Sequence, residues 1–233
     1  MTSEKKAMPL EKCICDKTRT DSRCIMNDKE EQTGKPSLLM HSCCGPCSTA
    51  CIERMAPDYE VTVFFYNPNI TDEDEYKKRR ENQIKFIKEY NEDPSIPYKV
   101  AYIEGDHDAD EFIKICGRYC DEPEGGKRCG LCFDMRLEKT AMTAALLNFD
   151  SFTTTLTVSP HKDQKAIFAI GRRHADTYQV GFLEEDFKKR DGFKRSVELA
   201  KKYGLYRQDF CGCEYSRREA EERRQKKQKG TEK

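Results

Sequence analysis

Adjacent cysteines mark the stretch of this sequence with the clearest potential for chemistry. The segment HSCCGPCS places Cys43 beside Cys44 and puts Cys47 one helical turn further on. It follows the apolar run 38–40, a pattern typical of a buried strand that leads into a tight turn and a helix. Thiolates close together repel one another unless a cation holds them or they oxidise. The segment therefore predicts a metal site or a redox pair.

A second cysteine pair, Cys129 and Cys132, could complete a metal site. It forms a CxxC at the end of a polar loop, where we expect a helix to open. Together with Cys43 and Cys44 it offers four thiolates, enough for a zinc ion or an iron–sulfur cluster. The wider perimeter of a cluster accommodates adjacent ligands more easily than one small tetrahedral ion does. The sequence therefore favours the cluster.

The segment Cys211-Gly212-Cys213 forms a third group of a different kind. Two thiols separated by one residue can close only a small, strained ring, and strained disulfides are the labile ones. Glycine allows the backbone to bend between them. The segment predicts a redox-active pair, and two further metal ligands are the open alternative.

The sequence CGPC at residues 44–47 leaves another activity open. It is the dithiol sequence of thioredoxins, and a thiol at a helix start has its pKa lowered by the helix dipole. The chain has no tryptophan to precede it, and a simple dithiol enzyme would need neither Cys43 nor the second CxxC. A thioredoxin-like thiol oxidoreductase using Cys44 and Cys47 is the enzymatic alternative. A zinc-stabilised RNA-binding module is the non-enzymatic one.

The elements that must position these cysteines alternate along the chain. Apolar runs predict strands at 38–40, 61–66, 98–103, 152–158 and 178–180. Helices are expected around 76–90, 112–119, 131–147, 167–170 and 196–203. Thr71 and Asp74 give a capping-box signal for the helix around 76–90. Asp163 can cap the helix that carries Ile167. The alternation predicts an α/β fold, a parallel sheet with helices on both faces, with its site at the carboxyl ends of the strands.

Composition bounds the class of protein. The 233 residues suffice for one α/β domain, and 42 basic against 42 acidic residues exclude attachment to nucleic acid by bulk charge alone. No apolar run spans a membrane and no signal-peptide core is present, so we expect a cytoplasmic protein. Thirteen cysteines in such a protein predict metal ligands or catalytic thiols rather than a disulfide framework.

The sequence divides into three parts. Residues 1–35 predict a loosely ordered polar leader, with Cys13, Cys15 and Cys24 among its charges. Residues 36–213 form the predicted catalytic α/β domain. Residues 214–233 are a highly charged tail, expected to be a helix that is either solvated or in contact with RNA.

Six motifs in one order make a resemblance specific. They are HSCCGPCS, FFYNPNI, the helix start EYKKR, RCGLCFDMRL, TTTLTVSPHKD and the terminal CGC, and they cover roughly residues 37–216. In this order the chain resembles the QueH type of epoxyqueuosine reductase. The resemblance implies an adenine-nucleotide hydrolase-like (HUP-like) core. It also implies reduction of epoxyqueuosine to queuosine in tRNA, the last step in making that wobble base.

The resemblance also assigns the cysteines. It implies that the ligands of a [4Fe–4S] cluster are Cys43, Cys44, Cys129 and Cys132. The redox-active disulfide of the family falls on Cys211 and Cys213, and Cys47 is a candidate ligand for an additional iron ion.

Conversion of an epoxide to an alkene takes two electrons and two protons and releases water. An iron with an open position can act as Lewis acid on the oxygen, and the Cys211/Cys213 dithiol could store the second electron. His161 and Lys162, at an expected strand end, are candidate proton donors or phosphate contacts. The electron donor is not identified by the sequence.

The substrate base implied by the resemblance lies in an anticodon loop. Proteins read such loops by stacking splayed bases on aromatic or arginine planes and by contacting phosphates. The candidates by residue type are Tyr66, Arg79, Arg136 and Arg172.

Overall fold

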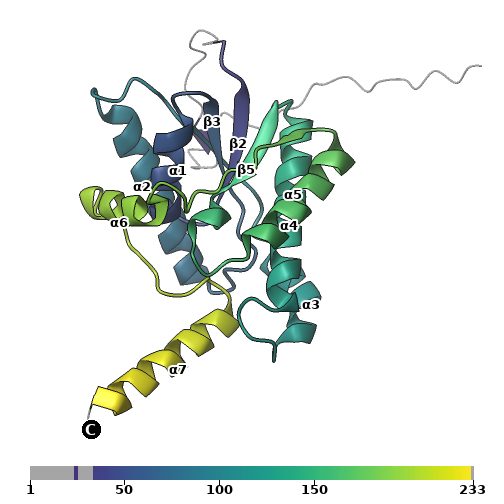
Figure 1. The fold of residues 1–233 in the computed structure, drawn as a ribbon, viewed down its shortest axis with the longest axis vertical. Coiled ribbons are helices and arrows are strands. Elements are labelled where there is room, and N and C mark those ends of the chain that lie inside the picture. The colour runs from purple at the N-terminus through teal and green to yellow at the C-terminus, as the bar shows by residue number, and fades with distance from the viewer. Residues whose placement is uncertain (1–23, 26–33, 232–233) are drawn as a thin grey trace, which may run out of the picture.

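The computed structural model describes residues 24–25 and 34–231 (Figure 1). Most of the predicted leader, including Cys13 and Cys15, lies outside the described residues. Cys24 and Ile25 form a two-residue strand, β1, which the sequence did not predict.

A six-stranded sheet in the order β1-β4-β3-β2-β5-β6 forms the centre of the molecule. Its strands are β1 (Cys24–Ile25), β2 (Ser37–Ser42), β3 (Glu60–Phe65), β4 (Ala101–Glu104), β5 (Ser151–Thr154) and β6 (Gly181–Phe182). β2 to β6 pair in parallel, and only β1 runs antiparallel, against β4. The predicted parallel α/β fold is therefore confirmed, and it is compatible with the adenine-nucleotide hydrolase-like core.

Helices cover both faces of the sheet, as predicted (Figure 1). Side chains alternate between the faces of a strand, so Leu38 and Met40 pack on one side of β2 and Leu39 on the other. The first side carries α1 (Gly45–Met55), α2 (Glu73–Glu92) and α6 (Gly192–Lys202), and the second carries α4 (Lys127–Leu146) and α5 (Gln164–Tyr178). β2 is thus buried on both faces, which explains its continuous apolar run.

Several predicted boundaries were wrong. The strand expected at 152–158 ends at Thr154, whose hydroxyl accepts from the N–H of Leu156 at 3.2 Å and starts the 3₁₀ turn η2 (Thr155–Val158). Of the strand expected at 178–180, Tyr178 is the last residue of α5 and Gln179 is its left-handed C-cap, and β6 follows at Gly181–Phe182. The first error extended a β-branched run past the hydrogen bond that ends the strand.

The start of α2 differs from its prediction as well. Asp72 caps this helix by accepting from the N–H of Glu75 at 2.8 Å, so the expected capping box of Thr71 and Asp74 is wrong. Asp163 does cap α5, accepting from the N–H groups of Lys165 at 2.9 Å and Ala166 at 3.1 Å.

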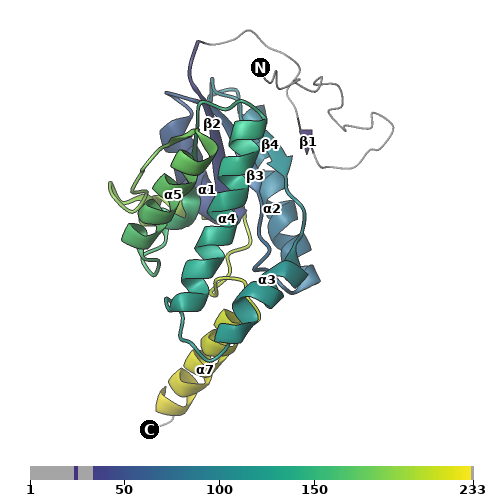
Figure 2. The same cartoon turned by 90° about the vertical axis from the view of Figure 1, so that its right-hand side faces the viewer.

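The remaining helices lie at the carboxyl edge of the sheet. They are α3 (Ala109–Cys116), the 3₁₀ turn η1 (Gly117–Tyr119) and α7 (Glu214–Thr231). α7 confirms the predicted charged C-terminal helix and extends from the body like an arm (Figures 1 and 2). Among the described residues, no helix combines the length and apolar character needed to cross a membrane.

Candidate metal centre

The turn between β2 and α1 presents the first cysteines. Cys43 and Cys44 follow the last residue of β2, and Cys44 is the N-cap of α1 with an extended backbone. Pro46 lies in the first turn of the helix, where its missing N–H costs no hydrogen bond. A Cβ at Gly45 would lie 2.9 Å from the carbonyl oxygen of Asn82, so glycine lets this turn approach α2 closely.

Three sulfurs gather at this turn. The Sγ atoms of Cys43 and Cys44 are 3.8 Å apart, and those of Cys43, Cys44 and Cys47 all lie within 4.8 Å of one another. Two sulfurs bound tetrahedrally at about 2.3 Å from one ion are separated by about 3.8 Å. The arrangement suits thiolates on one ion, and in a [4Fe–4S] cluster, which takes one cysteine at each iron, Cys43 and Cys44 would turn their sulfurs apart. Sequence reasoning had ranked Cys47 below the other two.

The protonation of these thiols also suits a cation. Hydrogen bonds from Cys44 and Cys47 hold the pKa of Cys43 well below its usual range. The hydrogen bond with Cys43 raises the pKa of Cys44 to about 11, and hydrogen bonds with both neighbours raise that of Cys47. One sulfur is thus ready as a thiolate while its neighbours keep their protons. A bound cation would replace those protons.

Cys129 and Cys132 lie in the first turns of α4, not in a loop ahead of it, because the helix begins at Lys127. Residues three apart share one face of a helix, so both thiols point to the same side. The N–H of Gly125 donates to Cys129 Sγ at 3.2 Å, and burial raises the pKa of both thiols.

Cys211 and Cys213 lie in the loop before α7, and both are free thiols in the structure. Gly212 between them has φ of +129°, a conformation that only glycine adopts without strain. Arg79 on α2 is almost fully buried and donates to the carbonyl oxygen of Cys211 at 3.0 Å. Glu75 pairs with Arg79 at 2.6 Å, so α2 holds this loop in place.

A buried polar network lies beneath the cysteines. Arg136 on α4, with no exposed surface, donates to Asn67 Oδ1 at 2.8 Å and to His41 Nε2 at 3.3 Å. His41 Nδ1 lies 2.8 Å from the hydroxyl of Thr154, and burial lowers the histidine pKa to about 3. The imidazole is therefore neutral. In the described part of the chain no carboxylate pairs with Arg136.

Thiols are the groups that balance this buried charge. Burial opposes the charge of Arg136, but Cys132, Cys43 and Cys211 outweigh it and raise the arginine pKa. Lys162 behaves in the same way, its pKa raised by Cys211, Cys43 and Cys47 against the effect of burial. All three cysteine groups thus lie within electrostatic reach of Arg136, and two of them also lie within reach of Lys162. Such a donor set, with cations to balance several thiolates, fits an anionic iron–sulfur cluster.

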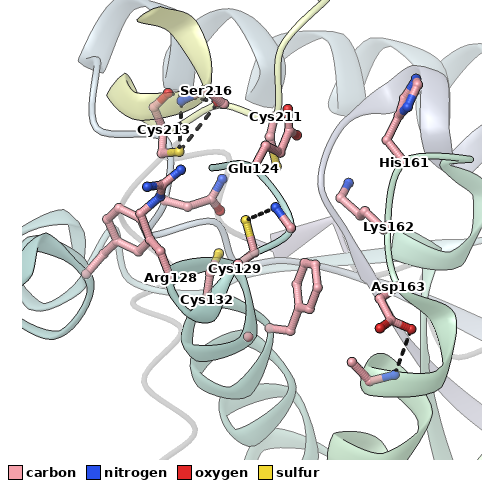
Figure 3. A pocket seen from close by; sticks show the side chains of 17 residues that line it. Glu124, Arg128, Cys129, Cys132, His161, Lys162, Asp163, Cys211, Cys213 and Ser216 are labelled. Atoms are coloured by element: carbon pink, nitrogen blue, oxygen red, sulfur yellow. Dashed lines mark hydrogen bonds between the residues drawn. The ribbon is translucent and has the colours of Figure 1, made fainter. Parts of the chain in front are cut away.

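One pocket brings two of the groups together. Cys129, Cys132, Cys211 and Cys213 all line it. Figure 3 shows the first two on α4, the other two in the loop at α7, and Lys162 on the opposite wall. Cys43 and Cys44 are not among its lining residues. Arg136 interacts electrostatically with Cys43, and its guanidinium also lies 4.0 Å from Cys132 Sγ.

Comparisons with known proteins agree on one family. A family model described as "Epoxyqueuosine reductase QueH" matches residues 38–219. A protein of that name from Streptococcus pyogenes is 41% identical over 187 residues, covering 80% of this chain and 72% of its own. Those of Haemophilus influenzae and Thermotoga maritima are 37% and 35% identical and cover 84% and 80% of this chain, and 78% and 93% of their own. This chain belongs to the QueH family. The QueH match includes all three cysteine groups.

Membership in the QueH family does not favour the thioredoxin-like alternative, nor do the thiols themselves. A nucleophilic dithiol needs a lowered pKa, whereas the pKa values of Cys44 and Cys47 are both raised. The CGPC sequence is at a helix start, as expected, but its neighbours oppose ionisation there.

Three of the four candidate RNA contacts are wrong for this QueH protein. Tyr66, Arg79 and Arg136 are at most 2% exposed and cannot stack on a base. Arg172 is exposed and pairs with Glu184 at 2.6 Å. His161 and Lys162 both line the pocket, and the side chain of His161 is exposed.

Sequence reasoning missed His41 and Asn67 as parts of the site. Both stand inside motifs of the QueH resemblance, HSCCGPCS and FFYNPNI, at the carboxyl ends of the apolar runs that form β2 and β3. A polar residue that ends a buried strand could have indicated them, because it needs a partner in the interior.

Proposed function

We propose that this protein reduces epoxyqueuosine in tRNA to queuosine with a [4Fe–4S] cluster held by cysteines. The ligands would be Cys43, Cys44, Cys129 and Cys132, and Cys47 is the candidate ligand for an additional iron ion. Membership in the QueH family is the observation that carries the activity. The buried Arg136, whose charge only thiols balance among the described groups, supports the cluster.

The two electrons of the reduction have a candidate source in the chain itself. A bound cluster would pass them on one at a time, and its iron would polarise the oxygen. Oxidation of the Cys211 and Cys213 thiols to a disulfide releases two electrons and two protons. The sum then balances, since epoxide and two thiols give alkene, water and a disulfide. An external electron donor must afterwards reduce the disulfide.

Lys162 is the candidate group for the departing oxygen. It lines the same pocket as Cys211 and Cys213, and its raised pKa keeps it as an ammonium at neutral pH. An ammonium can donate a hydrogen bond and then a proton to an oxygen that gains negative charge. His161, which is exposed at the rim, is better suited to a phosphate of the tRNA.

The decisive experiment is a nucleoside analysis. Protein reconstituted with iron and sulfide without oxygen is incubated with a reductant and tRNA that contains epoxyqueuosine. We expect queuosine to appear, and at most one queuosine per protein when the reductant is omitted. An intact cluster that yields no queuosine would reject the activity.

The colour of the purified protein tests the cofactor separately. Anaerobic preparation should give a brown protein, because sulfur-to-iron charge transfer absorbs broadly in the visible range. A colourless protein with stoichiometric zinc would instead support the zinc-stabilised RNA-binding module.

A further inference from the structure

The segment 206–213 joins α6 to α7 and ends in the Cys211/Cys213 pair. Both ends of the segment are fixed to α2. The N–H of Tyr206 donates to Asn82 Oδ1 at 2.8 Å, and Arg79 holds the carbonyl oxygen of Cys211 at 3.0 Å. The residues between these two anchors are therefore held close to the turn that carries Cys43 and Cys44.

Gln208, in the middle of this segment, reaches the metal site directly. Its Nε2 donates to Cys44 Sγ at 3.1 Å, and Cys44 itself is only 1% exposed. Once a bound metal has replaced its proton, the Cys44 thiolate accepts hydrogen bonds and cannot donate them, so the amide turns its nitrogen to the sulfur.

The other end of the amide is unsatisfied. Gln208 Oε1 is buried, and no hydrogen-bond partner lies near it among the described residues. A buried carbonyl oxygen without a partner is costly, and native structures keep few of them outside functional sites. The amide thus gives up a hydrogen bond at one end to keep the contact with sulfur at the other.

A donor at this sulfur has an electrical consequence. Reduction adds negative charge to an iron–sulfur centre, and part of it resides on the cysteine sulfurs. A hydrogen bond to such a sulfur stabilises the reduced form, and hydrogen bonds of this kind help set the reduction potentials of these centres.

We propose that Gln208 is a positioning residue that raises the reduction potential of the metal centre by donating a hydrogen bond to Cys44. The inference rests on the proposed function, because it takes Cys44 as a ligand of the centre. Gln208 is not among the residues that line the pocket of Lys162, Cys211 and Cys213, and it lies outside the six motifs.

The test compares midpoint potentials rather than turnover. Gln208→Leu has a similar volume and removes the donor, Gln208→Ala removes the side chain, and Gln225→Leu on the exposed face of α7 is the matched control. Iron per protein and visible absorption are measured first, and an anaerobic potentiometric titration follows. We expect both Gln208 variants to keep the iron and to shift the midpoint to more negative potential, while the Gln225→Leu variant matches the wild type.

Three results would overturn the inference. Gln208 variants with full iron content and the wild-type midpoint would show that the hydrogen bond has no electrical effect. Loss of iron from both variants would make Gln208 a requirement for assembly and not a tuning group. A wild-type protein without an iron–sulfur chromophore would defeat the proposed function as well, so the two failures are distinguishable.

Discussion

Cys129 and Cys132 enter the site from the rigid first turns of α4, whereas Cys211 and Cys213 stand in a loop. The proposed division between ligands and redox pair can therefore be separated by substitution. Changing Cys129 or Cys132 to serine should bleach the protein. Changing both Cys211 and Cys213 to serine should leave colour and iron largely intact and lower turnover by more than tenfold. Iron assay, visible spectra and nucleoside analysis measure the three effects.

A different pattern would reassign the terminal pair. If the double variant of Cys211 and Cys213 lost its iron as completely as the Cys129 variant, both thiols would be ligands. Substitution of Cys51 by serine is the control, because this buried thiol lies in α1 beyond the three gathered sulfurs.

Gly212 gives a second prediction, because its backbone and its surroundings both require glycine. Its φ is +129°, and a Cβ there would lie 3.0 Å from Ile70 and 3.2 Å from the guanidinium of Arg79. We expect Gly212→Ala to displace the loop, to lower the free energy of unfolding by about 1–3 kcal/mol, and to slow turnover. Urea denaturation and the turnover assay provide the measurements.

A matched glycine separates conformational strain from contact. Gly34 also has positive φ, at +73°, but a Cβ there would meet nothing within 4 Å. Gly34→Ala should cost less stability and leave turnover unchanged. Equal losses of stability in the two variants would show that the close approach of Gly212 to Ile70 and Arg79 does not add to the cost of its positive φ.

At the scale of single residues, the sequence indicated the site where it contains a chemically rare residue type. Grouped cysteines are scarce enough that spacing alone indicated a metal or redox site. Arg79 and Arg136 show the limit, because arginine is mostly exposed and residue type suggested a contact with RNA. Their burial depends on partners far away in the chain, the carbonyl oxygen of Cys211 and the side chain of Asn67, which no local pattern contains.

Helix α2 matters at the scale of elements because it supplies anchors for the 206–213 segment. Its own start depends on Asp72, which accepts from the N–H of Glu75 and pairs with Arg217 of α7 at 3.0 Å. We expect Asp72→Ala to lower the free energy of unfolding by about 0.5–2 kcal/mol at neutral pH. Asp74→Ala is the control, since its carboxylate does not cap the helix, and it should cost less.

The difference in free energy of unfolding between the wild type and the Asp72→Ala variant depends on pH with a definite sign. The N–H of Glu75, and then Arg217, hold the pKa of Asp72 below its usual value. A depressed pKa in the folded state stabilises the protein above the unfolded pKa, about 3.9, and the stabilisation is lost as the pH falls. The gap between wild type and the Asp72→Ala variant should therefore close below about pH 4 in urea denaturation. A gap that kept its neutral-pH size down to about pH 2 would contradict the contribution of the ionised carboxylate.

Element identities were largely predictable, and element ends were not. The period of apolar residues located β2, β3 and the helices around them. The end of β5 is decided by the hydroxyl of Thr154, and at the start of α4 the N–H of Lys127 donates to the carboxylate of Glu122 at 2.5 Å. These single hydrogen bonds leave no trace in hydrophobic periodicity.

The whole molecule separates its core from its chemistry. Fully buried apolar side chains such as Leu38, Leu39 and Val63 fill both faces of the sheet along the strands. The cysteines instead follow the strand ends, at the edge where α3 and α7 also lie (Figure 2). The alternation of strands and helices predicted this edge, because parallel strands all end on one side. Topology places Cys43 and Cys44 at this edge, directly after the end of β2.

This separation predicts how the protein responds to loss of its metal. Since the two buried clusters on the faces of the sheet are built without Cys43, Cys44 and Cys132, the protein stripped of iron should keep its helices in far-ultraviolet circular dichroism. A ligand present at a thousand times its Kd raises the free energy of unfolding by about 4 kcal/mol. If the metal centre contributes as much, its removal should lower Tm by roughly 10 °C. Hydrogen exchange should increase mainly in 125–132 and 206–213, which contact the site, and not in β2 or β3. Cooperative unfolding on removal of iron, as in a zinc finger, would instead mean that the metal organises the sheet itself.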